Sequence, residues 1–271
     1  MFNLPNLFTA ANLISGCLAI LLAVSGRIDL APFAIFAGAF FDFLDGFLAR
    51  KLHVSSEMGK QLDSLADMVT FGVAPGVIMM AVILNSQFLL ELRMADLFIV
   101  HEWSGGFNSL AAWLNGVIDG RSTYYLPFVG LIIPFFSLFR LAKFNLDTRQ
   151  AESFIGVPTP ASTIFFMSFP LAMVYMPPSG STMTAMYEVV FNPYVLSGLI
   201  LAMSLLLVSE VPLFSLKVKG FGWKENGVRY PFLLISLGLI IVFKAWSLAL
   251  IVFLYLILSL IENSIRKKQK E

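Results

Sequence analysis

This chain of 271 residues is poor in charged residues, in cysteine and in histidine. Charged residues make up 13% of the sequence, about half of the share that is usual in soluble domains. Its single cysteine, Cys17, cannot form an intrachain disulfide, and its only histidines, His53 and His101, lack the close spacing of a zinc site. The formal net charge of +1 leaves no basic surface of the kind that nucleic-acid-binding proteins present, so no nucleic-acid partner is expected.

Hydrophobic residues are what the sequence has in excess. They make up 58% of the chain, with 27 phenylalanines and a mean hydropathy of +0.83. A transmembrane helix needs about 20 mostly apolar residues, and apolar stretches recur along the chain at 12–24, 31–50, 58–84, 124–144, 158–175, 192–211, 230–243 and 246–261. The sequence therefore predicts an all-α fold, a polytopic membrane helix bundle of about eight transmembrane helices.

The predicted bundle divides into three regions. Residues 1–11 are expected to form a short interfacial segment, because Pro5 interrupts an apolar stretch that also carries polar residues. Residues 12–175 form the core of the bundle, with a long outer loop at 85–123 that includes apolar segments typical of short surface helices. Residues 176–271 supply the C-terminal transmembrane helices and a basic tail.

The positions of Lys and Arg predict how the chain is oriented. Of the 18 such residues, all but four fall on the side of the N-terminus when the predicted spans alternate in direction. The four on the other side are Arg27, Arg93, Arg121 and Lys244. Because Lys and Arg concentrate in cytoplasmic loops, both termini are predicted to be cytoplasmic, in an integral protein of a cell membrane, with a prokaryotic cytoplasmic membrane as the expected one.

Four carboxylates lie inside this apolar sequence. Asp42 and Asp45 fall near the cytoplasmic end of the second predicted span, and Asp63 and Asp67 near the same end of the third. Residues three or four apart share a helix face, so each helix is expected to present two acids to the other at one depth. Ionisable residues within membrane segments are usually functional, and these four form the candidate site.

Three interpretations of the acids follow from their chemistry. Four close carboxylates repel one another, and hard divalent cations such as Mg²⁺ or Mn²⁺ relieve that repulsion. Two such ions about 3.5 to 4 Å apart are a common device in phosphoryl transfer. The alternatives are a proton or ion pathway, as in a proton-coupled transporter, and structural pairing with Arg50 or Lys60.

The spacing of these acids resembles a known signature. The sequence reads Asp42-x-x-Asp45-Gly46-x-x-Ala49-Arg50, then eight residues, then Gly59-x-x-x-Asp63-x-x-x-Asp67. This is similar to the signature of the CDP-alcohol phosphotransferases at each fixed position. That family transfers a substituted phosphate from a CDP-linked lipid or alcohol to a hydroxyl group and releases CMP.

The resemblance implies roles for individual residues. Asp42, Asp45 and Asp63 would hold one divalent cation, and Asp42, Asp63 and Asp67 a second. Asp67 would act as general base on the acceptor hydroxyl, and the choice between Asp67 and Asp63 as the titrating group stays open. The nucleotide and its phosphates would be bound by small and polar residues around the acids, namely Gly46, Ala49, Arg50, Gly59, Asn6, Thr9 and Asn12. Helix capping is the alternative role of Thr9.

Further segments resemble the membrane-integral phosphatidylserine synthases. They are "LPNLFTAANLISGCLAI", "DSLADMVTFGVAPG", "FRLAKFNLD" and "FIGVPTPAS", all within residues 4–162. This likeness implies CDP-diacylglycerol as donor, L-serine as acceptor, and a serine-binding group of Arg140, Lys143 and Asn145. An arginine offers a two-pronged contact to a carboxylate, although basic residues at helix ends also anchor at lipid headgroups.

Two questions stay open from the sequence. Sibling transferases that use glycerol-phosphate, inositol-phosphate or another alcohol are the alternative to a serine enzyme. A homodimer is the assembly expected if the chain is not monomeric.

Overall fold

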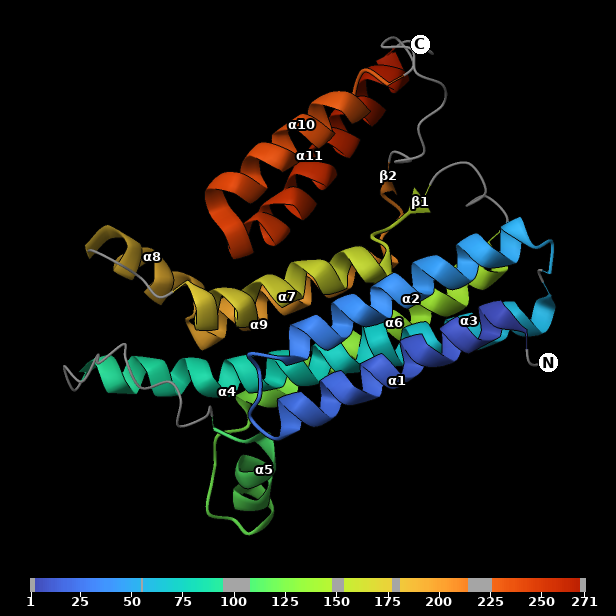
Figure 1. The fold of residues 1–271 in the computed structure, drawn as a ribbon. Helices are drawn as coiled ribbons and strands as arrows, with labels where there is room; N and C mark the ends of the chain where they lie inside the picture. Colours follow the sequence, from blue (N-terminus) through green and yellow to red (C-terminus); the bar gives the residue numbers. More distant parts are fainter. Residues whose placement is uncertain are drawn as a thin grey trace.

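The computed structural model describes residues 3–54, 56–94, 108–147, 154–176, 181–213 and 226–268. Figure 1 shows an elongated bundle of helices, with α10 and α11 set to one side of the others. In chain order the elements are α1 (Leu4–Val24), α2 (Ala31–Lys51), α3 (Glu57–Asp67), η1 (Met68–Val73), α4 (Ala74–Met94), α5 (Leu110–Ile118), η3 (Leu126–Leu131), α6 (Ile132–Leu146), β1 (Phe154–Ile155), α7 (Thr159–Tyr175), α8 (Ser181–Val190), α9 (Pro193–Val208), β2 (Pro212–Leu213), α10 (Arg229–Phe243), η5 (Lys244–Trp246) and α11 (Ser247–Lys268). The predicted all-α membrane bundle is confirmed, with one two-residue strand pair added.

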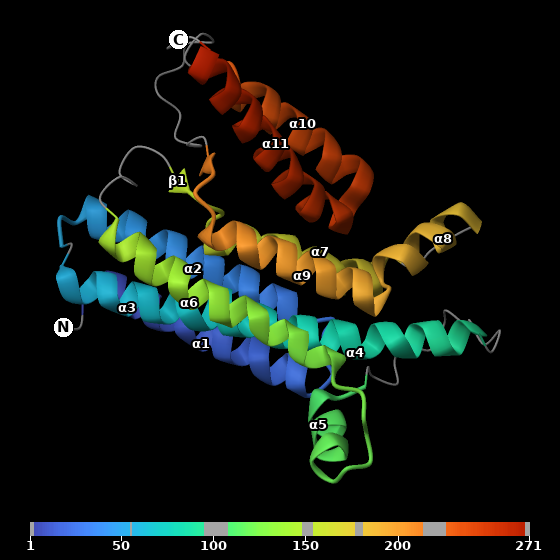
Figure 2. The same ribbon diagram turned by 180° about the vertical axis from the view of Figure 1, so that it is seen from behind.

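Each of the eight predicted spans coincides with an apolar helix. By length and composition, five helical stretches of the described residues can cross a membrane, or six if the bent α8–α9 pair is one span. The last of the five, Arg229–Asn263, folds back on itself, because Lys244 has a positive φ of 47° and α10 lies beside α11 in both views (Figures 1 and 2). How many of the eight cross a bilayer stays a prediction.

The N-terminal boundary differs from the prediction. Residues 4–11 are not a separate segment but the first turns of α1, which runs to Val24 without a break. Pro5 does not interrupt the helix, because it lies in the first turn, where its fixed φ and missing N–H are tolerated. The Asn3 side chain accepts a hydrogen bond from the Asn6 N–H at 3.0 Å and caps this end.

The third predicted span contains an irregularity that its hydropathy does not reveal. Directly after Asp67 the chain forms the π-helix η1, in which the Ala74 N–H donates to the Val69 carbonyl five residues back. The helix then continues in α4 as far as Met94, beyond the predicted end at residue 84. The predicted outer loop is therefore shorter, and α5 matches the short helix expected at its end; residues 95–107 of the loop lie outside the described residues.

With α3, η1 and α4 taken as one continuous helix, the long helices of the bundle alternate in direction, so the bundle has two ends. The N-terminus, the α2–α3 connection and β1 lie at one end, and the α1–α2 connection, α5 and α8 lie at the other (Figures 1 and 2). Basic residues of the last turns of α2 and α6, namely Arg50, Lys51 and Lys143, belong to the first end, whereas Arg27 precedes α2 at the second. The side of the membrane that each end faces stays a prediction.

α1 packs closely against η1, the π-helix that directly follows Asp67. A Cβ on Gly16 would lie 2.8 Å from the Thr70 Cα, a distance that real side chains do not tolerate, so glycine permits this approach. The buried Thr70 hydroxyl then donates to the Asn12 carbonyl at 2.9 Å. This contact fixes the part of α1 that faces Asp67.

Candidate active site

Three of the four predicted acids come together at one end of the bundle. Asp42 of α2 and Asp63 and Asp67 of α3 each offer a carboxylate oxygen, and these oxygens all lie within 4.8 Å of one another. Both helices pack against α1, which holds them so that their acid-bearing faces meet. Spacings of three and four residues place the acids of each helix on one face, as the sequence predicted.

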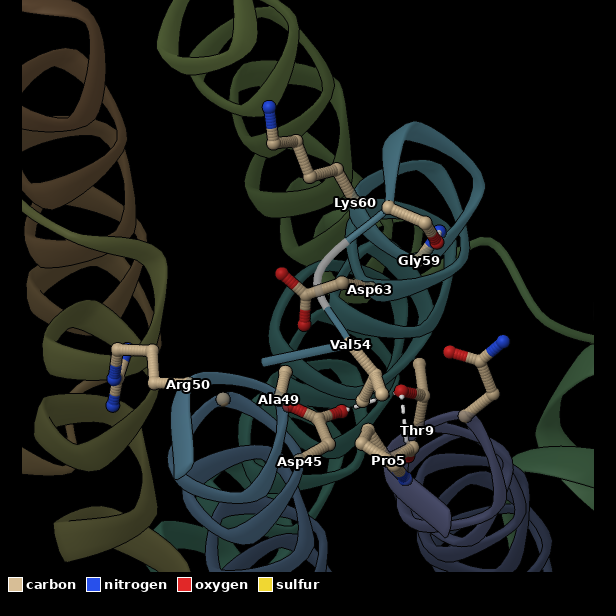
Figure 3. A pocket seen from close by; sticks show the side chains of 12 residues that line it. Pro5, Thr9, Asp45, Ala49, Arg50, Val54, Gly59, Lys60 and Asp63 are labelled. Carbon is tan, nitrogen blue, oxygen red and sulfur yellow. Dashed lines mark hydrogen bonds between the residues drawn. The ribbon is translucent and has the colours of Figure 1, made fainter. Parts of the chain in front are cut away.

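Asp45 lies apart from this group of three. It is buried at 5% exposure, and its Oδ2 accepts a hydrogen bond of 2.6 Å from the Thr9 hydroxyl of α1. Thr9 is itself within α1, with its hydroxyl oxygen also 3.2 Å from the Pro5 carbonyl oxygen, so it does not cap this helix. Figure 3 shows Thr9 of α1 hydrogen-bonded to Asp45 of α2, with Asp63 on α3. A metal-binding role for Asp45 stays a prediction.

Asn12 lies beneath the acids. It is completely buried, and its Nδ2 donates to the Asp67 Oδ1 at 3.1 Å, whereas its Oδ1 has no hydrogen-bond partner among the residues that the structure describes. The sequence associated Asn12 with the nucleotide, but in the structure it is not among the residues that line the pocket. Its amide contacts one oxygen of Asp67, and a role of Asn12 toward the nucleotide stays a prediction.

A cleft of about 600 Å³ opens beside the acids. It lies between the start of α1, the end of α2 and the start of α3 (Figure 3). Its lining residues are Pro5, Asn6, Thr9, Asp45, Gly46, Ala49, Arg50, Val54, Ser56, Gly59, Lys60 and Asp63. All of the predicted nucleotide-binding residues except Asn12 are in this set.

The cleft also has residues that the sequence did not assign to the nucleotide. Ser56 caps α3 by accepting a hydrogen bond from the Gly59 N–H at 3.0 Å. A serine directly before a helix was the signal for this cap, because serine is a preferred N-cap residue. Lys60 adds a second cation to the lining beside Arg50's contribution, and it pairs with the exposed Glu57 at 2.7 Å. Pro5 and Val54 supply apolar wall.

Structural pairing does not account for the acids. The ion pairs among the described residues are Arg27–Asp29, Lys60–Glu57, Arg121–Asp119 and Lys143–Glu210. Within that part of the chain, none of them includes Asp42, Asp45, Asp63 or Asp67. Oxygen ligands without a basic partner are the donor set that hard divalent cations prefer. The cluster of Asp42, Asp63 and Asp67 therefore fits a divalent metal.

The three predicted acceptor residues face different partners. Arg140 of α6 is buried at 3% exposure; its Nε donates to the Val157 carbonyl at 3.2 Å, and its guanidinium lies over the Phe144 ring. Lys143 pairs with Glu210 at 3.3 Å. Asn145 donates through its Nδ2 to the Ser64 hydroxyl at 2.9 Å.

One of these contacts connects α6 to α3, and the close packing of a serine connects α6 to η1. Ser64 follows Asp63 directly, so Asn145 fixes the end of α6 beside that acid. Ser137, one turn before Arg140, packs so closely on η1 that a Cβ on Gly72 would lie 3.1 Å from the Ser137 Cβ. The acceptor residues are thus on a helix that packs on η1, which directly follows Asp67, and contacts the residue next to Asp63.

Comparison with known proteins agrees with this geometry. The family model for CDP-alcohol phosphatidyltransferase matches residues 2–208. A CDP-diacylglycerol–serine O-phosphatidyltransferase of Bacillus subtilis is 34% identical over 164 residues, which cover 59% of this chain and 71% of that protein. One of Helicobacter pylori is 29% identical over 166 residues, covering 60% of this chain and 55% of the relative.

An archaeal relative extends the comparison. The archaetidylserine synthase of Methanothermobacter thermautotrophicus is 29% identical over 177 residues, which cover 64% of this chain and 59% of that protein. The chain thus spans less than two thirds of the Helicobacter and archaeal relatives. Since the family model matches well over half of its residues, and three of the four acids of the signature meet in one cluster, the chain belongs to the CDP-alcohol phosphatidyltransferase family.

Proposed function

We propose that this chain transfers the phosphatidyl group of CDP-diacylglycerol to the hydroxyl of L-serine, releasing CMP and forming phosphatidylserine. The observation that carries the proposal is the cluster of Asp42, Asp63 and Asp67 beside a cleft lined by the signature residues. The names of the matched bacterial relatives support serine as acceptor.

Two divalent cations, Mg²⁺ or Mn²⁺, complete the proposed site. Asp42, Asp45, Asp63 and Asp67 would hold them. When bound, the ions would neutralise the donor's phosphates and stabilise charge on the attacking and leaving oxygens.

The chain's own residues bind the donor and activate the acceptor. The cleft receives the CDP group, with the cations of Arg50 and Lys60 available to its phosphates and the small residues Gly46 and Ala49 leaving room. Asp67 takes the proton of the serine hydroxyl, and Asn12 holds the other carboxylate oxygen so that one oxygen stays directed at the acceptor. The serine oxygen forms a bond to the phosphatidyl phosphorus, the bond from phosphorus to CMP breaks, and CMP leaves with the electron pair.

Serine is a zwitterion, so its carboxylate needs a cation. Arg140 is our first choice, because its guanidinium can contact a carboxylate through two N–H groups and because α6 lies against η1. Lys143 and Asn145 are the second and third members of this site. A phosphorylated acceptor would need several basic side chains for its phosphate. Here one of the two cations, Lys143, already pairs with Glu210, which favours serine.

A product assay tests the proposal. Purified protein is incubated with CDP-diacylglycerol, Mg²⁺ or Mn²⁺, and in turn L-serine, glycerol-phosphate or inositol-phosphate, and CMP and the lipid product are identified. We expect CMP release and phosphatidylserine with serine alone. Faster turnover of a phosphorylated acceptor would replace serine by that acceptor, and no CMP with any alcohol would favour the transporter alternative.

We also propose that the acid-bearing end of the bundle faces the cytoplasm. Gln61 on α3 and Asn115 on α5 are both exposed and lie at opposite ends. In a Cys17→Ser background, Gln61→Cys should react with a membrane-impermeant thiol reagent only from the cytoplasmic side, and Asn115→Cys only from outside. The reverse labelling pattern would invert the topology.

A further inference from the structure

The connection between α6 and α7 is held by the end of α9. β1 pairs antiparallel with β2, with Phe154 opposite Leu213 and Ile155 opposite Pro212. The pairing continues as the Gly156 N–H donates to the Val211 carbonyl at 2.8 Å and the Val157 N–H to the Leu206 carbonyl at 3.1 Å. This fixes the backbone around Val157.

Glycine is required where the two segments meet. Gly156 has a φ of 76°, which side-chain-bearing residues rarely adopt. A Cβ at this position would lie 2.6 Å from the Leu207 carbonyl oxygen. The backbone of the connection therefore lies directly on the last turn of α9.

Both cations of the proposed acceptor site, Arg140 and Lys143, contact these two paired segments. The Val157 carbonyl is the acceptor for Arg140 Nε, and Glu210, two residues before β2, pairs with Lys143. Residues 209–213, called here the support segment, thus contact Lys143 directly and Arg140 through β1 and Val157. The family match ends at residue 208, so this segment lies beyond it.

The C-terminal helix α11 fixes the support segment from the other side. The Asn263 Nδ2 donates to the Pro212 carbonyl. This carbonyl belongs to the residue that is paired with Ile155, and α11 packs on both β2 and α7. In Figure 1 the α10–α11 hairpin lies beside the bundle at this point. One side-chain hydrogen bond therefore joins α11 to the segment that holds Val157.

We infer that α11 and the support segment form part of the acceptor site, and that Asn263 is a positioning residue that acts on Arg140 through Pro212, β1 and the Val157 carbonyl. This inference rests on the proposed function, because it takes Arg140 as the cation that receives the acceptor. It assigns a role in acceptor binding to the support segment and to α11, both beyond the matched region.

The expected effect is specific to the acceptor. Asn263→Asp has nearly the same shape but replaces the amide donor by an oxygen that faces the Pro212 carbonyl. Loss of one hydrogen bond corresponds to about 1 kcal/mol, or about a fivefold change. We expect the KM for serine to rise about fivefold, while the KM for CDP-diacylglycerol and the kcat at saturating serine stay within about twofold.

Controls separate positioning from folding. Asn263→Gln keeps the amide donor, so its KM for serine should stay close to the parental value. Asn115→Asp makes the same chemical change on α5, at the other end of the bundle, and should leave both KM values unchanged. If Asn263→Asp is not recovered folded, Asn263→Ala removes the donor without adding charge and is read by the same criteria.

A double-mutant cycle tests the route through Arg140. Combined with Arg140→Lys, Asn263→Asp should add little further increase in serine KM, because both changes act on one contact. Full additivity, an unchanged serine KM in Asn263→Asp, or equal increases in both KM values would overturn the inference. The parent protein's product assay is read separately: if another alcohol is the substrate, the proposed function fails, and the KM for that alcohol then tests Asn263.

Discussion

Asp63→Asn is expected to lower the rate of CMP release at least about 100-fold, a loss of the size seen for core catalytic groups. Among the described residues, Asp63 alone belongs both to the three-acid cluster and to the lining of the cleft. Asparagine keeps the shape of the side chain but removes its negative charge. The change therefore affects the point at which the nucleotide pocket meets the acids.

The measurement is the initial rate of CMP release at saturating Mg²⁺ or Mn²⁺. Asp119→Asn is the matched control, because it makes the same change in an exposed ion pair with Arg121 at the opposite end of the bundle. We expect this control to keep its activity within about twofold. An Asp63→Asn protein that is correctly inserted and retains near-parental rates would contradict the assignment of the site.

A second measurement does not depend on activity. A ligand that binds only the folded state raises the unfolding temperature by mass action. Mn²⁺ should therefore raise the unfolding temperature of the parent protein and raise that of Asp63→Asn much less. An equal rise in both proteins would place the metal away from Asp63.

The acids could be predicted because their arrangement is local. The i,i+3 spacing of Asp42 and Asp45 and the i,i+4 spacing of Asp63 and Asp67 set their helix faces, and a short connection brings α2 back toward α3. The alternation of apolar stretches likewise predicted the order and type of the helices. These are properties that a few neighbouring residues determine.

The contacts that orient the acids could not be predicted in the same way. Asn12 and Asp67 are separated by 55 residues, and Thr9 and Asp45 by 36. Both pairs depend on how closely α1 approaches its neighbours, which Gly16 permits at η1. The sequence indicated polar residues on α1 but not that two of them face carboxylates.

The support segment was missed for a different reason. β1 and β2 have two residues each, too few to show the alternation by which strands are recognised. Their pairing joins Phe154 to Leu213 across the whole of α7, α8 and α9. Hydropathy predicted the helices on both sides and gave no signal for the connection between them.

Arg140→Lys is expected to lower kcat/KM for serine about ten- to a hundredfold, since loss of a hydrogen bond to a charged group costs about 1.5 to 3 kcal/mol. Lysine keeps the positive charge but has neither the planar fork nor the Nε that donates to Val157. Steady-state kinetics should place the effect in the serine KM and leave the KM for CDP-diacylglycerol and the metal dependence within about twofold. Arg121→Lys, on the exposed ion pair of the opposite end, is the matched control.

Because Arg140 is buried, Arg140→Lys should lower kcat/KM for serine more than Lys143→Ala does. At 3% exposure the Arg140 guanidinium exchanges little of its bonding with water, whereas Lys143 is partly exposed and already paired with an exposed glutamate. Ion pairs at exposed positions contribute about 0 to 1 kcal/mol, so Lys143→Ala should change serine kinetics by about fivefold or less. Unchanged serine kinetics in both variants would place the acceptor pocket elsewhere, and a larger effect for Lys143→Ala would make Lys143 the cation that meets the carboxylate.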